Sequence, residues 1–506
     1  MKTITLWGKV TMLLFLAAGL SSIMSAQDQF RLSNYINPDY QWRKLDLDIS
    51  LGGSNAFNNL EVNGDDLFYH NKNNSNLFNS DFGLDYEAHK NSSRYQGYQF
   101  FSLSGLIDSR KIKDQDLAND EENTQKDNIQ RLYFSAHTVN RFYNAHKKFL
   151  EADLDLSSSL MNGKSSQSPY FGEPPVLTDS KNQGYVIDAS LPVLVGTGRI
   201  EEVQDARLAV YILDDLQNAG DLIRAADPAE IDAFARFITE VKNRRYYDVR
   251  IQKIDEITRI DSMLNAMGLK ARSDASYFTI LNDDWDYASG PVRRTGGRFS
   301  AGISPKVQWY YSYSDRTYYD SRIVPPYDYY GSTSKNYSTS WGIDFLTAYT
   351  WEKPANLYWQ HSVNATLVYS LNYEDIRLKD YLNDSLQNDY DRDMDSPALN
   401  LIAGYRLGFY PNSRTELILN INTIFIYNWE NYNYQDSEDQ DINNIETGYD
   451  LGFHCYYYIS ERLRLTVNVS EAYNYNHYYL VDNTANNNTS SDFNTTFGAG
   501  FLYKIF

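Results

Sequence analysis

The chain of 506 residues has a single cysteine, Cys455, so it cannot form an intrachain disulfide. Outside its N-terminal segment it has no apolar run long enough for a transmembrane helix, and its mean hydropathy is −0.56. Positive charge is also scarce, because 46 Lys and Arg stand against 66 Asp and Glu, which gives a formal net charge of −20. These absences argue against a small disulfide-stapled fold, a helical membrane protein and a nucleic-acid-binding protein.

Catalytic motifs are missing as well. The sequence has no glycine-rich phosphate loop and no metal-ligand cluster of a catalytic kind. None of its seven histidines forms a compelling pair with a serine on one strand face, which a barrel hydrolase needs. We therefore expect neither an enzyme nor a cofactor, and an outer-membrane hydrolase is the remaining enzymatic alternative.

Tyrosine is the residue that the chain has in excess, with 44 Tyr beside 24 Phe and 8 Trp. Tyr and Trp have an apolar body and a polar tip, which suits a membrane–water boundary. At the N-terminus, Lys2 and Lys9 precede the apolar segment Thr11–Leu20, and a cleavage point follows Ala26. This pattern predicts a signal peptide over residues 1–26. A retained membrane anchor is the alternative, although the apolar segment is short for a membrane span.

Most of the remaining chain alternates apolar and polar residues, which is the period of a β-strand with one apolar face. In the second half, strands are predicted over 299–313, 337–351, 357–373, 399–409, 415–427, 445–459, 463–469 and 492–506. Weaker alternation predicts strands in the first half at 45–51, 81–86, 101–105, 132–142, 150–156 and 185–191. We expect an all-β fold with about fourteen strands, within a range of about 12 to 16.

The predicted connections between strands alternate in length. Short ones fall at 144–147, 352–356, 411–413 and 460–462, and long polar ones at 53–76, 108–128, 161–182, 315–336, 375–395 and 430–443. Short periplasmic turns and long outer loops are the layout of outer-membrane barrels. A soluble β-sandwich or propeller, which is the alternative, does not explain the asymmetry.

With its signal sequence, alternating strands, unequal connections and terminal Phe506, the chain resembles the Gram-negative outer-membrane β-barrel proteins, the porin-like class in the broad sense. The resemblance covers most of residues 46–506. It implies a closed antiparallel transmembrane barrel in the cell outer membrane, with membrane lipid and the barrel-assembly machinery as partners. Typical members place the terminal aromatic residue on the lipid-facing stripe, whereas here that stripe ends at Ile505.

Residues 199–268 break the strand pattern. Apolar residues recur at helical spacing over 201–219 and 244–267, and Asp227-Pro228-Ala229-Glu230 is a signature of a capped helix start. Six predicted strands precede this insert, so strand parity predicts three helices on the periplasmic side. They would cap or plug the barrel, or dock a periplasmic protein or polymer. The following segment, 273–294, resembles neither strand nor helix.

The expected divisions are a first barrel half over 27–196, an insert with its connecting segment over 197–295, and a second barrel half over 296–506. Charged residues on the polar strand faces are predicted to line the lumen: Asp46, Asp48, Asp81, Asp85, Glu151, Asp153, Asp155 and Asp188 on early strands, and Lys306, Arg406, Arg464 and Lys504 on later ones. Opposed charges would create a transverse field that orients polar solutes. Alternatively, they pair and stabilise a packed lumen.

Four alternating carboxylates in a predicted outer loop form a weak candidate metal site: Asp389, Asp391, Asp393 and Asp395. A solvated acidic loop is the simpler interpretation. For the whole chain we expect a channel or transporter that passes small polar solutes or a polymer across the outer membrane. The alternatives are an export or assembly component whose helices, within 199–268, dock periplasmic machinery, and a surface receptor or adhesin that acts through its outer loops.

Overall fold

The computed structural model describes residues 30–63, 68–116, 121–168, 176–244, 249–287, 292–320, 329–434, 440–459, 463–480 and 487–503. The predicted signal peptide over 1–26 lies outside these residues, and so do Lys504, Ile505 and Phe506. Within the described ranges, none of the helices has the length and apolar character that a membrane crossing requires.

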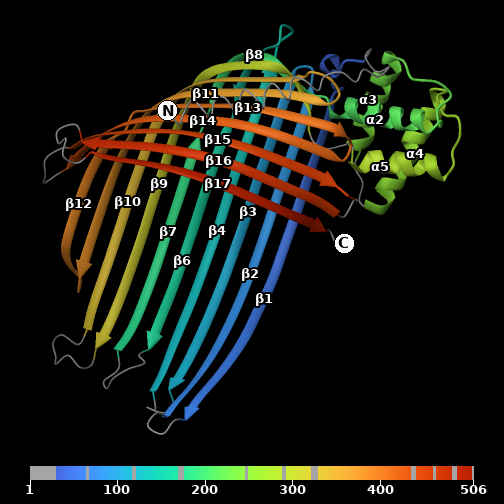
Figure 1. Ribbon diagram of the computed structural model, residues 1–506. Coiled ribbons are helices and arrows are strands. Elements are labelled where there is room, and N and C mark those ends of the chain that lie inside the picture. The colour runs from blue at the N-terminus through green and yellow to red at the C-terminus, as the bar shows by residue number, and fades with distance from the viewer. Residues whose placement is uncertain are drawn as a thin grey trace, which may run out of the picture.

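The described part of the chain forms one antiparallel sheet of 17 strands, four α-helices and a short 3₁₀ helix, as Figure 1 shows. The first strands are β1 (Tyr40–Asn63), β2 (Phe68–Ser92), β3 (Tyr95–Asp116), β4 (Glu121–Tyr143), β5 (Lys148–Ala152), β6 (Leu154–Ser168), β7 (Val176–Ser190) and β8 (Val193–Glu202). The later strands are β9 (Arg294–Asp320), β10 (Tyr329–Pro354), β11 (Trp359–Leu382), β12 (Ser385–Asp395), β13 (Ala398–Asn412), β14 (Thr415–Tyr434), β15 (Gln440–Tyr458), β16 (Leu463–Leu480) and β17 (Asn488–Tyr503). The helices are η1 (Leu32–Asn34), α2 (Gln204–Asn218), α3 (Pro228–Lys242), α4 (Val249–Ala266) and α5 (Ala275–Tyr287).

The number of strands corrects the predicted fourteen. Three passes of the chain across the sheet are each broken into two strands: β5 and β6 both pair with β4, β7 and β8 with β9, and β12 and β13 with β11. The breaks fall at Asp153, at Leu191-Pro192 and at Ser396-Pro397. Two of them contain proline, which has no N–H to donate to the ladder. The 17 strands therefore occupy fourteen positions across the sheet.

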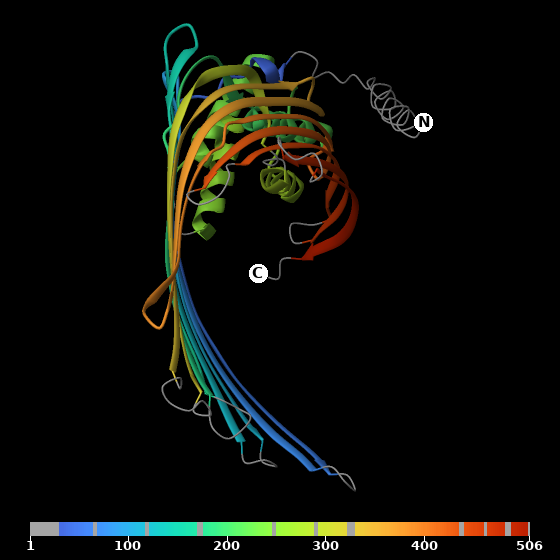
Figure 2. The same cartoon turned by 90° about the vertical axis from the view of Figure 1, so that its left-hand side faces the viewer.

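The sheet is open in the described ranges, and the closed barrel expected from the sequence stays a prediction. β1 and β17 are its two edges, and no pairing between them occurs in the described ranges. Figure 2 shows the later strands curling into an arch while the early strands continue as a long wall. The antiparallel pairing of strands that follow one another in sequence, and a helical insert between β8 and β9, are as predicted.

The predicted long loops are mostly strand. β1 and β2 continue as paired strands over 53–63 and 68–76, in which Asn55 faces Asn76 and His70 hydrogen-bonds Asn59 at 2.8 Å. The other long polar connections likewise extend neighbouring strands, as the length of the wall in Figure 2 shows. Backbone pairing continues there without apolar alternation, so the sequence pattern ends before the strand does.

The two faces of the sheet differ in chemistry. Residues directly opposite in an antiparallel pair share a face, and the register brings Leu47 beside Leu84 and Leu84 beside Leu103. This apolar face is exposed: Leu47 is 64%, Trp341 59% and Phe497 73% accessible. An exposed apolar surface that continues over strand after strand marks contact with lipid or with another protein.

The buried core of the molecule lies in the helical insert. Its central side chains are fully buried and come from all four helices: Leu208, Ile212, Leu216, Phe234, Ile238, Ile260, Leu264, Tyr277 and Leu281. η1 joins this core through Leu32, and the Tyr35 hydroxyl lies 3.3 Å from Thr239 Oγ1. Figure 1 shows the helices at the ends of the later strands. The insert therefore packs as a unit at one end of the sheet.

The helices correct the predicted insert in two respects. The segment 273–294 contains α5, so the insert has four helices among the described residues and not three. β8 also continues to Glu202, so the helices begin at Gln204. The capping box of α3 is as predicted: Asp227 Oδ1 accepts hydrogen bonds of 2.9 Å from the backbone N–H groups of Ala229 and Glu230.

Because the core of the insert is tightly packed, truncating one of its buried side chains should lower the stability of the insert substantially. Phe234→Ala removes a fully buried ring and is expected to lower the unfolding free energy of the insert by about 3–5 kcal/mol. Ile254→Ala, at a side chain that is 70% exposed, should change it by less than about 0.5 kcal/mol. Hydrogen exchange of α2 and α3 in the intact protein measures both values, and equal losses would contradict this core assignment.

Candidate functional site

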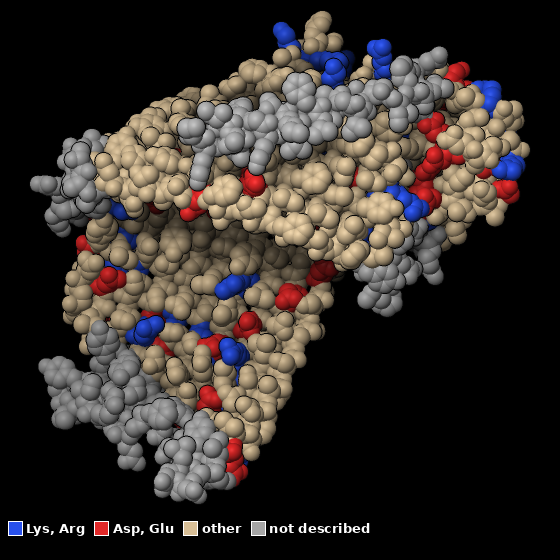
Figure 3. All heavy atoms as spheres, in the orientation of Figure 1, with Lys and Arg blue, Asp and Glu red and all other residues tan. Residues whose placement is uncertain are grey.

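The inner, concave face of the sheet holds a charged hollow of about 570 Å³. Asp155 on β6, Asp188 on β7 and Lys306 on β9 line it, together with His137 and Glu374. Figure 3 shows basic and acidic side chains interspersed on the wall below the arch. Three of the predicted lumen residues are thus brought together from strands that are neighbours in the sheet, although 151 residues separate Asp155 from Lys306 in sequence.

The charges in this hollow are paired with neighbours. His137 Nδ1 contacts Asp155, and Gln308 donates to Asp188, which also accepts from Ser157 Oγ at 3.3 Å. Lys306 Nζ lies 2.7 Å from Asp344 Oδ1. The hollow therefore mixes both signs of charge within a short distance, so a polar solute there would meet hydrogen-bonding groups of either sign.

Other predicted lumen acids lie elsewhere on the sheet. Asp46 is paired with Lys44, and Asp81 accepts from Ser50 on the neighbouring strand. Glu151, by contrast, is only 4% exposed and binds Arg141 through two hydrogen bonds of 2.5 and 2.9 Å. Asp153 is also buried and accepts a hydrogen bond of 3.0 Å from the backbone N–H of Asn140. Asp48 lies on β1 and Asp85 on β2. Glu151 and Asp153 thus hold strands together instead of presenting charge to a solute, because neither is solvent-exposed.

The predicted basic residues Arg406 and Arg464 lie on β13 and β16, away from the hollow. Both are close enough to Glu416 to interact with it electrostatically, and so is Arg207 of the insert. The Arg464 guanidinium lies over the ring of Tyr456 at 5.2 Å. These residues form a second charged group, where the insert meets the sheet. Lys504 lies outside the described residues.

The acidic run proposed as a weak metal site is a strand and not a loop. Asp389 and Asp391 lie on β12, opposite Lys379 and Arg377 of β11. Lys379 Nζ is 2.9 Å from Asp389, and Arg377 contacts Asp375 at 2.8 Å and Asp391 at 3.7 Å.

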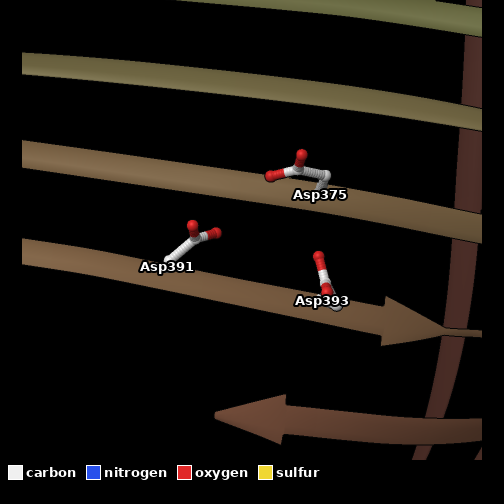
Figure 4. Close-up of side chains that lie close together, drawn as sticks. All are labelled: Asp375, Asp391 and Asp393. Atoms are coloured by element: carbon white, nitrogen blue, oxygen red, sulfur yellow. The ribbon is translucent and has the colours of Figure 1, made fainter. Parts of the chain in front are cut away.

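Figure 4 shows the carboxylates of Asp375, Asp391 and Asp393 on two neighbouring strands. Their oxygens lie within 4.8 Å of one another. The predicted Asp395 is not part of this group. Arg377 already supplies positive charge to two of the three carboxylates, and a divalent-cation site here remains a prediction.

The contact between insert and sheet was not foreseen from the sequence. Arg207 on α2 is fully buried without a hydrogen-bond partner for its guanidinium in the described chain, and it lies 5.2 Å from the ring of Tyr410 on β13. Arg293 lies over the same ring and donates to the backbone carbonyls of Asn356 and Trp359 at 2.8 Å. In the sequence, the one feature that could have indicated this contact is the position of Arg207 on the apolar stripe of a predicted helix.

Burial of the two arginines at this contact changes their electrostatic environment. Burial and the neighbouring charge of Arg207 lower the pKa of Arg293 to about 9, so it remains charged at neutral pH. Its guanidinium donates to the carbonyls of the β10–β11 turn. On the opposite side, Arg414 binds Asp283 of α5 at 2.5 Å. The insert is therefore fastened to two turns of the sheet by charged hydrogen bonds, which are stronger than neutral ones.

Comparisons with known proteins add little to this geometry. The sequence matches no protein-family model and no curated protein sequence. Among solved structures it is similar to the translocator domain of the autotransporter NalP from Neisseria meningitidis, with 8% sequence identity over 84% of this chain and 91% of that chain, and a TM-score of 0.21. A likeness at this TM-score carries no argument about function, which has to be argued from the residues.

A buried acid pair in the insert predicts pH-dependent stability. Burial, and then the charge of Asp215, raise the pKa of Asp284 to about 8, and burial also raises the pKa of Asp215. A raised acid pKa means that the folded insert binds protons more tightly than the unfolded chain. Its stabilisation is therefore full below about pH 4 and is lost as pH rises through about 8, on the order of 1.4 kcal/mol per pKa unit.

Asp284→Asn should flatten this dependence, and Asp232→Asn, at an exposed position that pairs with Arg236, should preserve it. Hydrogen exchange of α2 and α5 between pH 5 and pH 8 measures the slope. An unchanged slope in Asp284→Asn would contradict the assignment.

Proposed function

We propose that the chain is an outer-membrane β-barrel that passes a polar solute or a polymer across the membrane. The observation that carries this proposal is the opposition of faces: apolar side chains such as Trp341 and Phe497 are exposed on the outside, while Asp155, Asp188 and Lys306 gather on the inside. Lipid needs the first surface and an aqueous path needs the second. The proposed partners are outer-membrane lipid and the barrel-assembly machinery. Passage requires no catalytic group, and the proposal includes none.

Closure of the sheet is part of the proposal. Unpaired backbone groups on β1 and β17 are unfavourable in a bilayer, because no water reaches them there. β1 runs away from the helices and β17 runs towards them, as Figure 1 shows, so the two edges are antiparallel. Fourteen positions are also an even number, which bacterial barrels require. We infer that β1 and β17 pair when the protein enters the membrane.

Cysteine cross-linking tests this seam. In a Cys455→Ala background, Asp46→Cys on the inner face of β1 is combined in turn with Gly498→Cys, Gly500→Cys and Leu502→Cys on β17. We expect one of the three combinations to form a disulfide efficiently in the membrane-inserted protein, because one register will bring the two Cβ atoms within bonding range. Mass spectrometry of the joined peptides measures it.

The matched control for the seam pairs Asp46→Cys with Gly404→Cys, which lies on β13 far across the sheet. Its cross-linking gives the background expected from random collisions. If none of the three β1–β17 combinations exceeds this background, the edges do not pair and the closed barrel is wrong.

The insert is proposed to plug one mouth of the barrel. It lies at the end of the later strands and is held to the strand turns by Arg293 and Arg414. Exposed apolar side chains on α4, Ile251 at 61% and Ile254 at 70%, favour a second role in which the insert docks a periplasmic partner during export. The two roles are compatible if docking displaces the plug.

Single-channel recording separates these roles. Arg293→Ala combined with Arg414→Ala removes the bonds from insert to turns and should raise the open probability of the reconstituted protein by roughly tenfold or more, since two charged hydrogen bonds are lost. Arg236→Ala, on the exposed side of α3, should leave it unchanged. Conductance in none of the three proteins would contradict the channel and leave the docking role.

A further inference from the structure

Four lysines form a basic patch on the outer face of the early strands. Lys111 lies on β3, Lys126 on β4, Lys164 on β6 and Lys181 on β7, and together they line a hollow of about 540 Å³. We call these four residues the lysine patch. Their alternation with inward-facing residues, and their pairing along the sheet, put all four on the same face as the exposed leucines.

The lysine patch is only partly neutralised, because one of its four members, Lys181, lies opposite an acid, Asp315 of β9. The register sets Lys111 directly opposite Lys126 and Lys164 opposite Lys181, and like charges in such positions destabilise a sheet. None of the four forms an ion pair in the part of the chain that the structure describes, whereas nearby Lys113 is paired with Glu122 at 2.9 Å.

Three carboxylates, Asp127, Asp179 and Asp315, and one further cation, Arg110, also line the hollow. The three acids leave two of the five positive charges unbalanced, and Asp315 Oδ1 already accepts from Thr333 at 3.2 Å. A net positive hollow of this kind is complementary to an anion from outside the protein.

The position of the patch indicates which anion. An apolar hollow of about 590 Å³, lined by Leu132, Leu160 and Tyr185, adjoins it on the same face. Lys181 is four residues beyond Tyr185 on β7, about 13 Å further from the helices. Tyr185 belongs to a row of tyrosines with Tyr311 and Tyr337, whose ring centroids are 5.3 and 4.9 Å apart in succession. Such a row marks the edge of a hydrocarbon layer, where lipid headgroups begin.

We propose that this double hollow is a binding site for a phosphate-bearing lipid of the leaflet distant from the helices. The acyl chains occupy the apolar hollow, and the phosphates lie on the lysine patch. The proposal rests on the membrane insertion proposed above. Each lysine near an anionic lipid surface contributes separately, and four on adjacent strands give a local site instead of a diffuse attraction.

The test compares two quadruple variants of the full chain in detergent micelles. One changes Lys111, Lys126, Lys164 and Lys181 to Gln, and the control changes four exposed lysines near the helical end of the sheet, Lys90, Lys147, Lys148 and Lys353, to Gln. The probe is an acylated glucosamine disaccharide with two phosphates, and its binding is measured by native mass spectrometry. We expect the patch variant to lose at least about tenfold in affinity, and the control to stay within about twofold of the unaltered protein.

Two further probes identify the source of the phosphate. The same lipid without its phosphates should bind the unaltered protein as weakly as the intact lipid binds the patch variant. The headgroup without acyl chains should also bind weakly, because it leaves the apolar hollow empty. Equal losses in both quadruple variants, tight binding of the dephosphorylated lipid, or tight binding of the headgroup alone would each overturn the proposal.

The fold of each variant is checked separately by the mobility of unheated samples in gel electrophoresis, which reports barrel formation. If no sample shows a folded barrel in any lipid or detergent, the membrane proposal fails and the lipid site fails with it. If all samples fold and the losses are equal, the lipid site alone fails.

Discussion

The hydrogen-bond ladder between neighbouring antiparallel strands is the interaction on which the rest of this structure depends. It accounts for the backbone polar groups of most of the chain, and it leaves the side chains with two faces of independent chemistry. The outer face can therefore be apolar and exposed, as at Leu47 and Phe497, without a layer of protein to cover it. The inner face can hold charges because strands on either side supply partners, as Asp344 does for Lys306.

The same constraint explains why a compact hydrophobic core occurs only in the insert within the described residues. Strands that place most of their apolar groups outwards have few left to bury, whereas α2 to α5 bury theirs against one another around Phe234 and Ile238. The fully buried Arg207 and Arg293 then connect this small core to the turns of the sheet. The insert is thus a conventional soluble fold attached to a sheet whose outer face matches a bilayer.

Much of the architecture could be predicted because period-two alternation is visible in any strand that has one wet and one apolar face. The prediction failed where that contrast weakens. Residues 53–63 and 68–76 are paired strand although both of their faces are largely polar. Asp389 to Asp395 are part of β12, where cross-strand Lys379 and Arg377 compensate their charge. Asp155, Asp188 and Lys306 could be placed on the inner face by parity. Their meeting in one hollow, and the burial of Glu151 against Arg141, depend on the strand register, whereas alternation alone gives only the face on which a side chain lies.

The opposition of the two faces in a bilayer is the central claim, and β15 offers a direct measurement of it. In a Cys455→Ala background, single cysteines are introduced from Tyr449 to His454 and treated with a water-soluble thiol reagent in the membrane-inserted protein. The account predicts a strict alternation: cysteines at 450, 452 and 454, on the inner face, react, and those at 449, 451 and 453, beside lipid, do not. Uniform reactivity along the strand, or the reverse alternation, would contradict it.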